Sequence, residues 1–276
     1  MGRRPKSMRD ALEGRLDENE LDLVPRAFDI IGDIAVLDLP DELSGKRKLI
    51  GEALLETFTN IKVVVNKKSN VETEYRIKDV EAIAGEDRTV TVHKEYGCSY
   101  KLDISRAYFS PRLGTERMRV AEQVNEGERV LVMFAGIGPY AILIAKKRKP
   151  SEVVAVEINP DAVRYMRENV KLNKVNVTIV EGDAREEVPK LGEFDRIIMP
   201  LPKDAQDFLD VAVPAAKDGG IIHFYSFAHT PEELGERVKE VCSSLGCKVE
   251  VENSVQCGSY SPCLSRTCAD FRVTKD

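Results

Sequence analysis

The stretch RVLVMFAGIGPYAILIAKKRKPSEVVAVE, residues 129–157, decides the fold. It begins with a continuous apolar run, RVLVMF (129–134), which ends at glycines and is typical of a strand buried on both faces. The helix-like segment AILIAKKRK (141–149) follows, and a second apolar run, VVAVE (153–157), comes after it. A strand, a helix and a strand in this order predict a βαβ unit with two parallel strands in one sheet.

The same alternation continues to the end of the chain. The pattern predicts helices at 161–174, 204–216 and 231–246, and strands at 177–183, 195–200, 219–227, 248–255 and 268–273. This order predicts an α/β, Rossmann-like domain with a mostly parallel sheet and a closing antiparallel hairpin.

The first 105 residues show a different pattern. It predicts helices at 8–15 and 46–58, strands at 62–65 and on either side of Gly32-Asp33, and a hairpin across 89–104. We therefore expect two domains, a small α+β domain over 1–105 and the Rossmann-like domain over 106–276.

The composition excludes several classes of protein. Of 276 residues, 42% are hydrophobic and 32% are charged, which is ordinary for a globular protein and argues against extensive disorder. No apolar run approaches the roughly 18 residues of a membrane span, and no apolar segment follows the basic N-terminus. We expect a cytoplasmic protein. The spacing of the six cysteines matches no common zinc motif, so we expect reduced thiols and no metal.

Two glycines mark a candidate ligand site after the first predicted strand of the large domain. Gly136 and Gly138 allow the backbone to approach a ligand, and the helix that follows presents free N–H groups. The third glycine of a dinucleotide-binding motif is absent, and Pro139 follows instead. By itself the turn is therefore equally consistent with a tight strand–helix connection that binds nothing.

Acidic residues at the ends of the next two strands strengthen this interpretation. Glu157 ends the second strand, where Rossmann-type sites place an acid that binds ribose hydroxyls. Asp183 follows the third strand, where a carboxylate can accept from an adenine amino group. The alternative for each acid is a helix N-cap or a solvated strand end. The sequence has no Walker lysine, and we favour S-adenosylmethionine (AdoMet) over NAD or ATP.

A proline turn follows the fourth strand, with Pro200 and Pro202 in Met-Pro-Leu-Pro. Two prolines fix the backbone and remove two N–H donors, which leaves carbonyls available in the crevice. Such a turn suits a planar substrate, although a stiff loop without a ligand is the alternative.

Several segments together resemble one family, the archaeal and eukaryotic tRNA guanine-37 N1-methyltransferases, which are class I AdoMet enzymes. The resemblance rests on MFAGIGPY (133–140), EINPDAVRYMRENVKLNKV (157–175), EGDARE (181–186), IIMPLPKDAQDFLD (197–210) and DGGIIHFYSF (218–227). It extends to YRIKDVEAIAG (75–85), AYFSPRLGTERMRV (107–120) and SYSPC (259–263), and so covers nearly the whole chain. It implies a class I methyltransferase fold, AdoMet as cofactor, and transfer of a methyl group to N1 of guanine 37 in the anticodon loop of tRNA.

The resemblance also implies roles for individual residues. Glu116 matches the family's proposed general base, and Arg76 matches an arginine that stabilises charge on O6 of guanine. Arg117 and Tyr108 match residues near AdoMet. The expected cofactor-binding set is completed by Phe134, Ala135, Gly136, Gly138, Glu157, Ile158, Asp183, Ala184 and Pro200, and the expected substrate-binding residues are Arg76, Pro200 and Pro202. The alternatives are an exposed helix ion pair for Glu116 with Arg119 or for Arg117, and a surface arginine for Arg76.

The sequence departs from the family pattern in four places. Pro200 stands where the family usually has Asn, Val132 replaces an acid, and Glu157 replaces Asp. The chain is also expected to lack an additional small N-terminal domain that contacts the tRNA elbow. Proline at position 200 is similar to members that also methylate a tricyclic wyosine intermediate, so this second activity is an alternative. Aminocarboxypropyl transfer from AdoMet, a silent RNA-binding relative and a small-molecule methyltransferase are further alternatives.

The charge distribution bears on the expected RNA partner. The chain has 41 basic and 47 acidic residues, a net charge of −6, which by itself argues against nucleic-acid binding. Lys62, Lys67 and Lys68 nevertheless form a basic cluster, and residues 101–119 carry five basic and two acidic side chains. Because phosphate contact requires only a local patch, we expect a monomer that binds tRNA with modest, salt-sensitive affinity.

Overall fold

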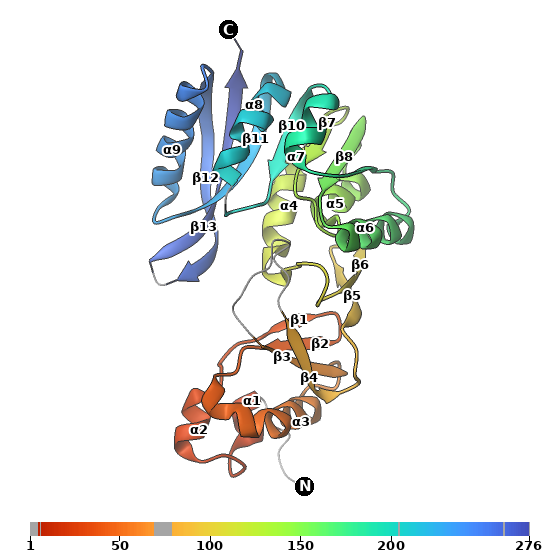
Figure 1. Ribbon diagram of the computed structural model, residues 1–276, viewed down its shortest axis with the longest axis vertical. Coiled ribbons are helices and arrows are strands. Elements are labelled where there is room, and N and C mark those ends of the chain that lie inside the picture. The colour runs from red at the N-terminus through yellow and green to blue at the C-terminus, as the bar shows by residue number, and fades with distance from the viewer. Residues whose placement is uncertain (1–4, 6, 69–78, 204, 262, 276) are drawn as a thin grey trace. The chain divides into compact units, whose positions relative to one another are not determined.

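The computed structural model describes the chain except for residues 1–4, 6, 69–78, 204, 262 and 276. The chain divides into two compact units (Figure 1). One comprises residues 1–94 with 99–111, and the other comprises residues 95–98 with 112–276. The chain therefore passes between the units more than once, and the single boundary predicted at residue 105 stays a prediction.

The first unit is built on a four-stranded sheet of order β1-β2-β3-β4, in which only β2 and β3 are parallel. Buried side chains of the helices, such as Leu12 and Leu54, share a core with Leu37 and Val64 of the sheet. The elements are α1 (Met8–Leu12), α2 (Glu18–Leu23), β1 (Asp29–Ile31), β2 (Ile34–Leu37), α3 (Arg47–Thr57), β3 (Val63–Lys67), β4 (Val80–Gly85), β5 (Val90–Glu95) and β6 (Cys98–Asp103). The last two form a separate two-stranded sheet that continues into the second unit.

The second unit contains a seven-stranded sheet of order β12-β13-β11-β10-β7-β8-β9. Strands β7 to β11 are parallel, and β13 lies antiparallel between β11 and β12, as the sequence predicts. The elements are α4 (Gly114–Glu122), β7 (Arg129–Val132), α5 (Pro139–Lys147), β8 (Glu152–Glu157), α6 (Pro160–Asn173), β9 (Thr178–Glu181), α7 (Ala184–Glu187), β10 (Phe194–Met199), α8 (Leu209–Ala215), β11 (Ala216–Ala228), α9 (Pro231–Ser244), β12 (Lys248–Ser261) and β13 (Leu264–Thr274).

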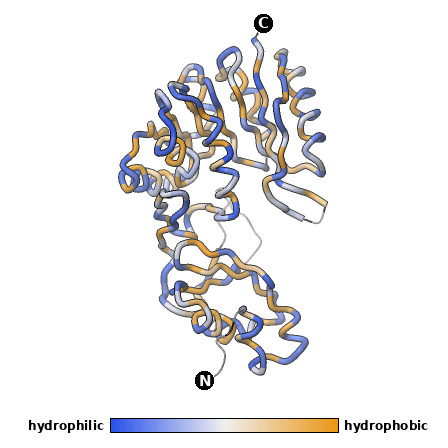
Figure 2. The backbone as a smooth tube through the Cα atoms, turned by 180° about the vertical axis from the view of Figure 1, so that it is seen from behind, coloured by the Kyte–Doolittle hydropathy of each residue, from blue (hydrophilic) through white to orange (hydrophobic). Residues whose placement is uncertain are grey.

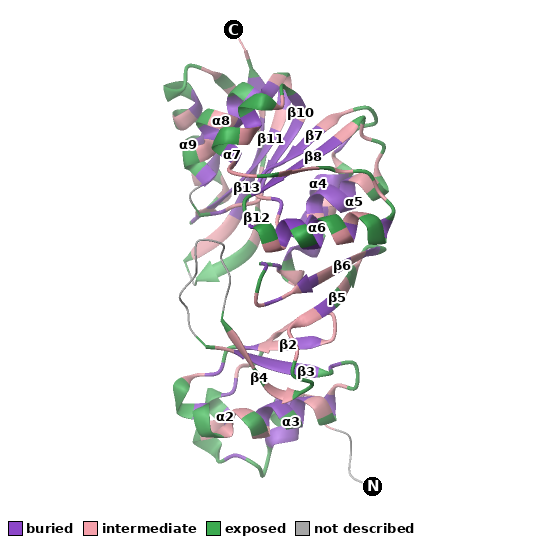
Figure 3. Cartoon of the chain, turned by 45° about the vertical axis from the view of Figure 1, so that its right-hand side comes forward, coloured by how far each residue is buried: buried purple, intermediate pink, exposed green. Residues whose placement is uncertain are grey.

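The central strands of this sheet are buried on both faces, which explains their continuous apolar sequences (Figures 2 and 3). Leu131 and Met133 pack in one core with residues of α7, α8 and α9. Val130 and Val132 point to the opposite face and are equally buried, and α5 and α6 pack against β8. Among the described residues, no helix is both long enough and apolar enough to cross a membrane.

The strand order reverses at the edge of the sheet where the sequence predicts ligand binding. From β7 the chain continues to β8, which pairs with one side of β7, whereas β10 pairs with the other side. The direction in which strands are added to the sheet therefore reverses at β7. Ligands of open α/β sheets bind at such a reversal, beyond the carboxyl ends of the strands. Glu157 and Asp183 follow the carboxyl ends of β8 and β9, so both predicted acids lie along this edge.

The turn between β7 and α5 is tight and left-handed at three positions. The φ angles are 53° at Phe134, 57° at Gly136 and 87° at Gly138. A bulky residue such as Phe134 adopts this region only when its surroundings enforce it, and such strain gathers at functional sites. Gly138 is the N-cap of α5 and Pro139 its first residue, where a missing N–H costs nothing.

We predict that Gly138→Ala destabilises the protein more than Gly127→Ala. Both glycines have similar φ angles, 87° and 83°, so both substitutions incur the left-handed penalty of about 1–2 kcal/mol. A Cβ at Gly138 would also meet Met166 Cγ at 2.8 Å, whereas a Cβ at Gly127 meets nothing within 4 Å. We expect this clash to add about 1–3 kcal/mol, measured as free energy of unfolding in urea. Equal losses for the two variants would contradict this account of the turn.

Candidate active site at the carboxyl edge of the sheet

Glu157 joins the turns that follow β7 and β8. Its Oε2 accepts a hydrogen bond from the Gly136 N–H at 2.6 Å, and its Oε1 accepts one from the Asn159 N–H at 2.8 Å. The residue is only 9% exposed, so it is not a solvated strand end. The N-cap of α6 is Asn159, whose side chain accepts from the first turn of that helix. Glu157 is therefore a buried acceptor that joins two turns at this edge of the sheet.

Asp183 is the N-cap of the short helix α7, which is the alternative that the sequence leaves open. Its Oδ1 accepts from the Arg185 N–H at 2.8 Å. Gly182, which precedes it, has a φ angle of 158°, and Ala184, which follows it, is buried. An N-cap uses one carboxylate oxygen, so Asp183 can cap α7 and still present Oδ2 to a ligand.

Apolar side chains line the same edge. Ile158 is 43% exposed beside the buried Glu157, which makes it an apolar surface next to a polar anchor. Phe134 meets Phe208 edge to face with ring centroids 4.8 Å apart, and the guanidinium of Arg185 lies over Phe208 at 4.5 Å. Ala135 is buried, and its N–H donates to the Val156 carbonyl.

The proline turn after β10 is partly closed on itself. The Leu201 N–H donates to the Met199 carbonyl at 2.8 Å, so this carbonyl is used within the turn. Pro200 is half-buried and Pro202 is buried. The expectation that the turn leaves carbonyls available to a ligand stays a prediction, because this hydrogen bond uses only one of the two lone pairs of the Met199 carbonyl oxygen.

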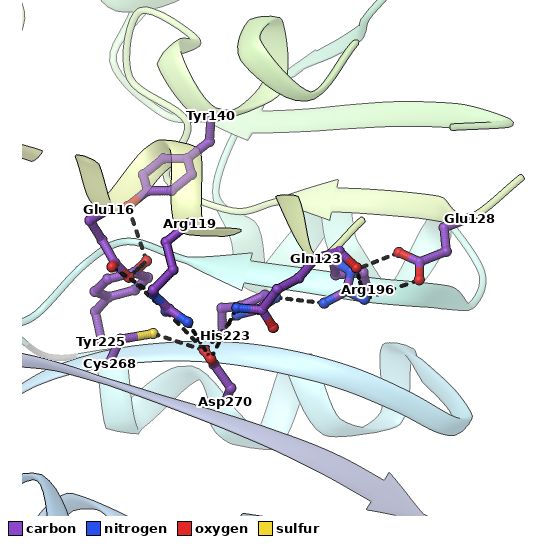
Figure 4. Close-up of polar contacts among 10 residues, drawn as sticks. All are labelled: Glu116, Arg119, Gln123, Glu128, Tyr140, Arg196, His223, Tyr225, Cys268 and Asp270. Atoms are coloured by element: carbon purple, nitrogen blue, oxygen red, sulfur yellow. Dashed lines mark hydrogen bonds and ion pairs between the residues drawn. The ribbon is translucent and has the colours of Figure 1, made fainter. Parts of the chain in front are cut away.

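Glu116 lies in the first turn of α4 and is only 7% exposed. Arg119 donates to it twice, from Nε to Oε2 and from Nη2 to Oε1, both at 2.8 Å. The Tyr225 hydroxyl of β11 donates to Oε1 at 2.6 Å and itself accepts from the Tyr140 hydroxyl at 3.0 Å (Figure 4). The ion pair expected as the alternative reading is present, but it is buried and belongs to a larger cluster.

Arg119 connects Glu116 to a second buried acid, Asp270 of β13. It donates from Nη1 to Oδ2 at 2.5 Å and from Nη2 to Oδ1 at 3.2 Å. Burial by itself lowers the pKa of the Arg119 guanidinium, but its hydrogen bonds to Glu116 and Asp270 outweigh burial and raise that pKa. Arg119 therefore remains a cation between two carboxylates.

His223 of β11 continues the cluster on the far side of Asp270. Its Nδ1 lies 2.6 Å from Asp270 Oδ1, and its Nε2 lies 2.8 Å from Arg196 Nη1. A guanidinium only donates, so Nε2 accepts and Nδ1 carries the proton. Burial lowers the pKa of His223 and favours the neutral ring, although the hydrogen bond that His223 donates to Asp270 acts in the opposite direction. Arg196 in turn forms a bidentate pair with Glu128 at 2.7 and 3.0 Å.

Three of these residues resemble a metal site by type. Ligand atoms of His223, Cys268 and Asp270 lie within 4.8 Å of one another and are buried. However, the Cys268 Sγ donates to Asp270 at 3.3 Å, and burial raises the pKa of this thiol well above its usual value. Arg119 and Arg196 also bring positive charge to the two other candidate ligands. This group is explained by ion pairing, and we assign no metal to it.

Three predicted residues remain, Arg117, Tyr108 and Arg76. Arg117 is 2% exposed and forms a bidentate pair with Glu95, from Nε at 2.6 Å and from Nη2 at 2.7 Å. Tyr108 belongs to the first unit and is exposed. Arg76 lies outside the described residues. The cofactor and substrate roles of these three residues stay predictions.

Sequence reasoning overlooked most of the buried polar cluster. It considered Glu116 and Arg119, but not Tyr225, His223 or Asp270. One signal was available: Asp270 interrupts the apolar strand CADFRV (268–273), and a lone acid in a buried strand requires a partner. The partner could not be identified, since Arg119 lies 151 residues away in the sequence.

A family model for the TRM5/TYW2 methyltransferase domain matches residues 91–251, and a model for the TYW2 N-terminal domain matches residues 8–89. The chain belongs to the TRM5/TYW2 methyltransferase family. It is 45% identical to tRNA (guanine(37)-N(1))-methyltransferase Trm5b of Pyrococcus abyssi, over 99% of this chain and 82% of the relative. The crystal structure of that Trm5b superposes with a TM-score of 0.89 and covers 100% of this chain and 82% of its own. This agreement confirms the predicted family and the class I fold.

Two further solved structures bear on function. The complex of aTrm5 with tRNALeu has a TM-score of 0.88 and 33% identity, over 99% of this chain and 80% of that chain. TYW2 of Pyrococcus horikoshii in complex with MeSAdo has a TM-score of 0.81 and 33% identity, over 98% of both chains. The P. horikoshii tRNA(Phe) (4-demethylwyosine(37)-C(7)) aminocarboxypropyltransferase is 34% identical, over 97% of this chain and 96% of its own.

We predict that His223 makes the protein less stable as the pH falls from 6.5 to 5. The unfolded chain takes up a proton near the ordinary pKa of 6.5, whereas the folded protein, with its lowered His223 pKa, does not. The free energy of unfolding should therefore fall by up to about 1.4 kcal/mol per pH unit. The His223→Gln variant should have a lower free energy of unfolding than the unmodified protein at pH 7.5. This free energy should fall less than that of the unmodified protein when the pH is lowered to 5, as measured by urea unfolding.

The matched control is His229→Gln, because His229 is exposed. Comparing the two variants shows whether the pH dependence is specific to the buried histidine. Stability curves of His223→Gln and the unmodified protein that run parallel between pH 6.5 and 5 would contradict the assignment of a buried neutral histidine.

Proposed function

We propose that this protein transfers a methyl group from AdoMet to N1 of guanine 37 in tRNA. The observation that carries this proposal is Glu116, a buried acid that accepts three hydrogen bonds on its two oxygens. These hydrogen bonds hold the carboxyl group in one orientation, and a general base requires such fixed geometry. Membership of a family with named tRNA guanine-37 methyltransferases supports the substrate.

The crevice has the features that an AdoMet site requires. Gly136 and Gly138 bring the backbone close to the crevice, and Glu157 is a buried acceptor suited to ribose hydroxyls. Asp183 and Ile158 supply a second acceptor and an apolar contact suited to adenine. We therefore assign the cofactor to this edge, with Phe134, Ala135, Ala184 and Pro200 completing its surroundings. Bound AdoMet supplies an electrophilic methyl group.

The chemistry for this chain's own residues is proton removal. N1 of guanine carries a proton, and its loss places negative charge on O6. Glu116 accepts that proton, and Arg76 is predicted to stabilise the O6 charge. Pro200 and Pro202 are predicted to contact the base.

The proposed partner is the anticodon loop of tRNA. Bases of a single-stranded loop are splayed out at low energetic cost, which allows a crevice to receive guanine 37. Lys62 and Lys68 are exposed, whereas Lys67 pairs with Asp38 at 2.9 Å. The basic surplus expected at 101–119 is smaller in the folded chain, because the side chains of Arg117 and Arg119 form ion pairs within the second unit. A cytoplasmic location and a monomeric state stay predictions.

We predict that Glu116→Gln lowers the single-turnover rate of methyl transfer by about 100-fold or more, the usual size of a general-base contribution. AdoMet affinity, measured by calorimetry, should change little, since the residues proposed to bind AdoMet remain. The control is Glu122→Gln, which removes the same charge from an exposed position on the same helix. An unchanged rate for Glu116→Gln would remove this residue as the base.

The second candidate is chemistry on a tricyclic wyosine intermediate at the same tRNA position, by methyl or aminocarboxypropyl transfer. The TYW2 N-terminal domain model matches residues 8–89, and the P. horikoshii TYW2 structure is covered over 98% of its length. Pro200, in place of the family's usual Asn, favours methyl transfer to the tricyclic intermediate over aminocarboxypropyl transfer. Both candidates use the same cofactor and differ in the nucleoside produced.

Nucleoside mass spectrometry of two tRNAs, one unmodified and one carrying the tricyclic intermediate, decides between the candidates. Methylguanosine from the first tRNA supports the main proposal, and a product only from the second supports the alternative. No AdoMet turnover with either would contradict both and favour a small-molecule enzyme, and failure to bind AdoMet would favour a silent RNA-binding relative.

We predict that Pro200→Asn shifts the ratio of products from these two tRNAs. Asn adds a side-chain donor and acceptor and restores a backbone N–H, so it changes which base edge the turn can recognise. The same tRNA mixture, assayed with the two proteins in parallel, gives this ratio directly. Identical product ratios would show that the residue at this position does not select the substrate.

A further inference from the structure

The hydrogen bonds on Glu116 use all but one of its acceptor positions. A carboxylate has about four lone-pair sites, two on each oxygen. Oε1 accepts from the Tyr225 hydroxyl at 2.6 Å and from Arg119 Nη2 at 2.8 Å, which occupies both of its sites. Oε2 accepts from Arg119 Nε at 2.8 Å. The described partners of Glu116 therefore leave one lone-pair site, and it lies on Oε2.

Both donors are themselves held in place. Tyr225 is buried, and its oxygen accepts from the buried Tyr140 hydroxyl, which directs the Tyr225 proton toward Glu116 (Figure 4). Burial raises the pKa of Tyr225 well above its ordinary value, so this hydroxyl keeps its proton. Arg119 is fixed from the opposite side by two hydrogen bonds to Asp270.

Asp270 is in turn anchored by residues outside α4. His223 donates to its Oδ1, and the side-chain amide of Gln123 donates to its Oδ2 at 3.3 Å. Burial by itself raises the pKa of Asp270, but the hydrogen bonds from His223 and Arg119 outweigh burial and keep that pKa below its usual range. If the Arg119 guanidinium turned toward Glu116 alone, Asp270 would lose two of its hydrogen bonds and its paired cation.

We infer that Tyr225 and Arg119 are positioning residues that reserve a single lone pair of Glu116, on Oε2, for the N1 proton of the substrate. Asp270 acts one step further away by holding Arg119. This inference rests on the proposed role of Glu116 as the base. It goes beyond that role because it states which oxygen reacts and which side chains select it.

The proton and electron balance is simple. The N1–H bond breaks, an O–H bond forms at Oε2, and the electron pair of the broken bond stays on N1. N1 then forms a bond to the methyl carbon of AdoMet, the S–CH3 bond breaks, and its electron pair stays on the sulfur of the S-adenosylhomocysteine that leaves. The proton then passes from Oε2 to solvent water, which restores the carboxylate. Tyr225 keeps its own proton throughout, so it acts on the rate only through Glu116.

A double-mutant cycle tests this inference on the full-length protein. The variants are Tyr225→Phe, Glu116→Gln and the two combined, and the measurement is the single-turnover methyl-transfer rate at saturating AdoMet and tRNA. We expect Tyr225→Phe to reduce the rate about tenfold, because Oε1 gains an open lone pair and the carboxylate loses a contact. In the Glu116→Gln background, Tyr225→Phe should have no further effect, since residues that act as a unit are non-additive.

The comparison variant is Tyr140→Phe. It removes a hydroxyl from an equally buried tyrosine in the same cluster and takes away the donor that orients the Tyr225 hydroxyl, while the hydrogen bond from Tyr225 to Glu116 can still form. Its rate should fall less than that of Tyr225→Phe. AdoMet affinity and urea unfolding, measured for every variant, separate loss of positioning from loss of binding or folding.

The outcomes separate failure of this inference from failure of the proposed function. If Glu116→Gln lowers the rate but the two substitutions are additive, the role of Tyr225 is structural and the inference is overturned. An unchanged rate for Tyr225→Phe overturns it in the same way. If Glu116→Gln has no effect, the base assignment itself fails. Should Tyr225→Phe not fold, the same cycle with Asp270→Asn, which weakens the hold on Arg119, replaces it.

Discussion

The Arg119 guanidinium lies between two buried carboxylates, Glu116 of α4 and Asp270 of β13, and the rest of the candidate active site depends on it. Removing one partner of a buried ion pair costs about 3–5 kcal/mol, so both carboxylates depend on this cation. The same side chain fixes α4 against the antiparallel end of the sheet. The helix α4 precedes the first parallel strand in the sequence, and this pairing attaches it to the sheet.

A third buried acid, Glu157, holds the turns at the carboxyl ends of β7 and β8 in a similar way. Glu157 accepts from the backbone of the turn after β7 and of the turn after β8, and so it holds two neighbouring crevice loops together. The strained φ of Phe134 and the left-handed glycines belong to the first of these loops. In both halves a carboxylate is positioned by donors that are fixed before any ligand arrives, which is the preorganisation that electrostatic catalysis requires.

Local charge counting along the sequence was misleading at α4. Residues 101–119 have a basic surplus by composition, and Arg117 and Arg119 contribute to it. In the folded chain both arginines are paired inside the second unit, with acids that include Glu95 and Asp270, which lie 22 and 151 residues away. Net charge over a short segment predicts an RNA-binding patch only when its side chains are exposed, and burial is a property of the tertiary structure.

The sequence by itself determined the βαβ architecture, the glycine turn and the acids at the strand ends. These features depend on hydrophobic periodicity and on backbone conformation over a few residues, so a local pattern is sufficient to predict them. It also indicated the family, through segments whose order spans the chain. Only the tertiary structure decided how Glu116 is held, because Tyr225 lies 109 residues from it and Asp270 lies 151 residues from Arg119. Those partners approach one another only when β11 and β13 pair beside α4, and no spacing in the sequence records that pairing.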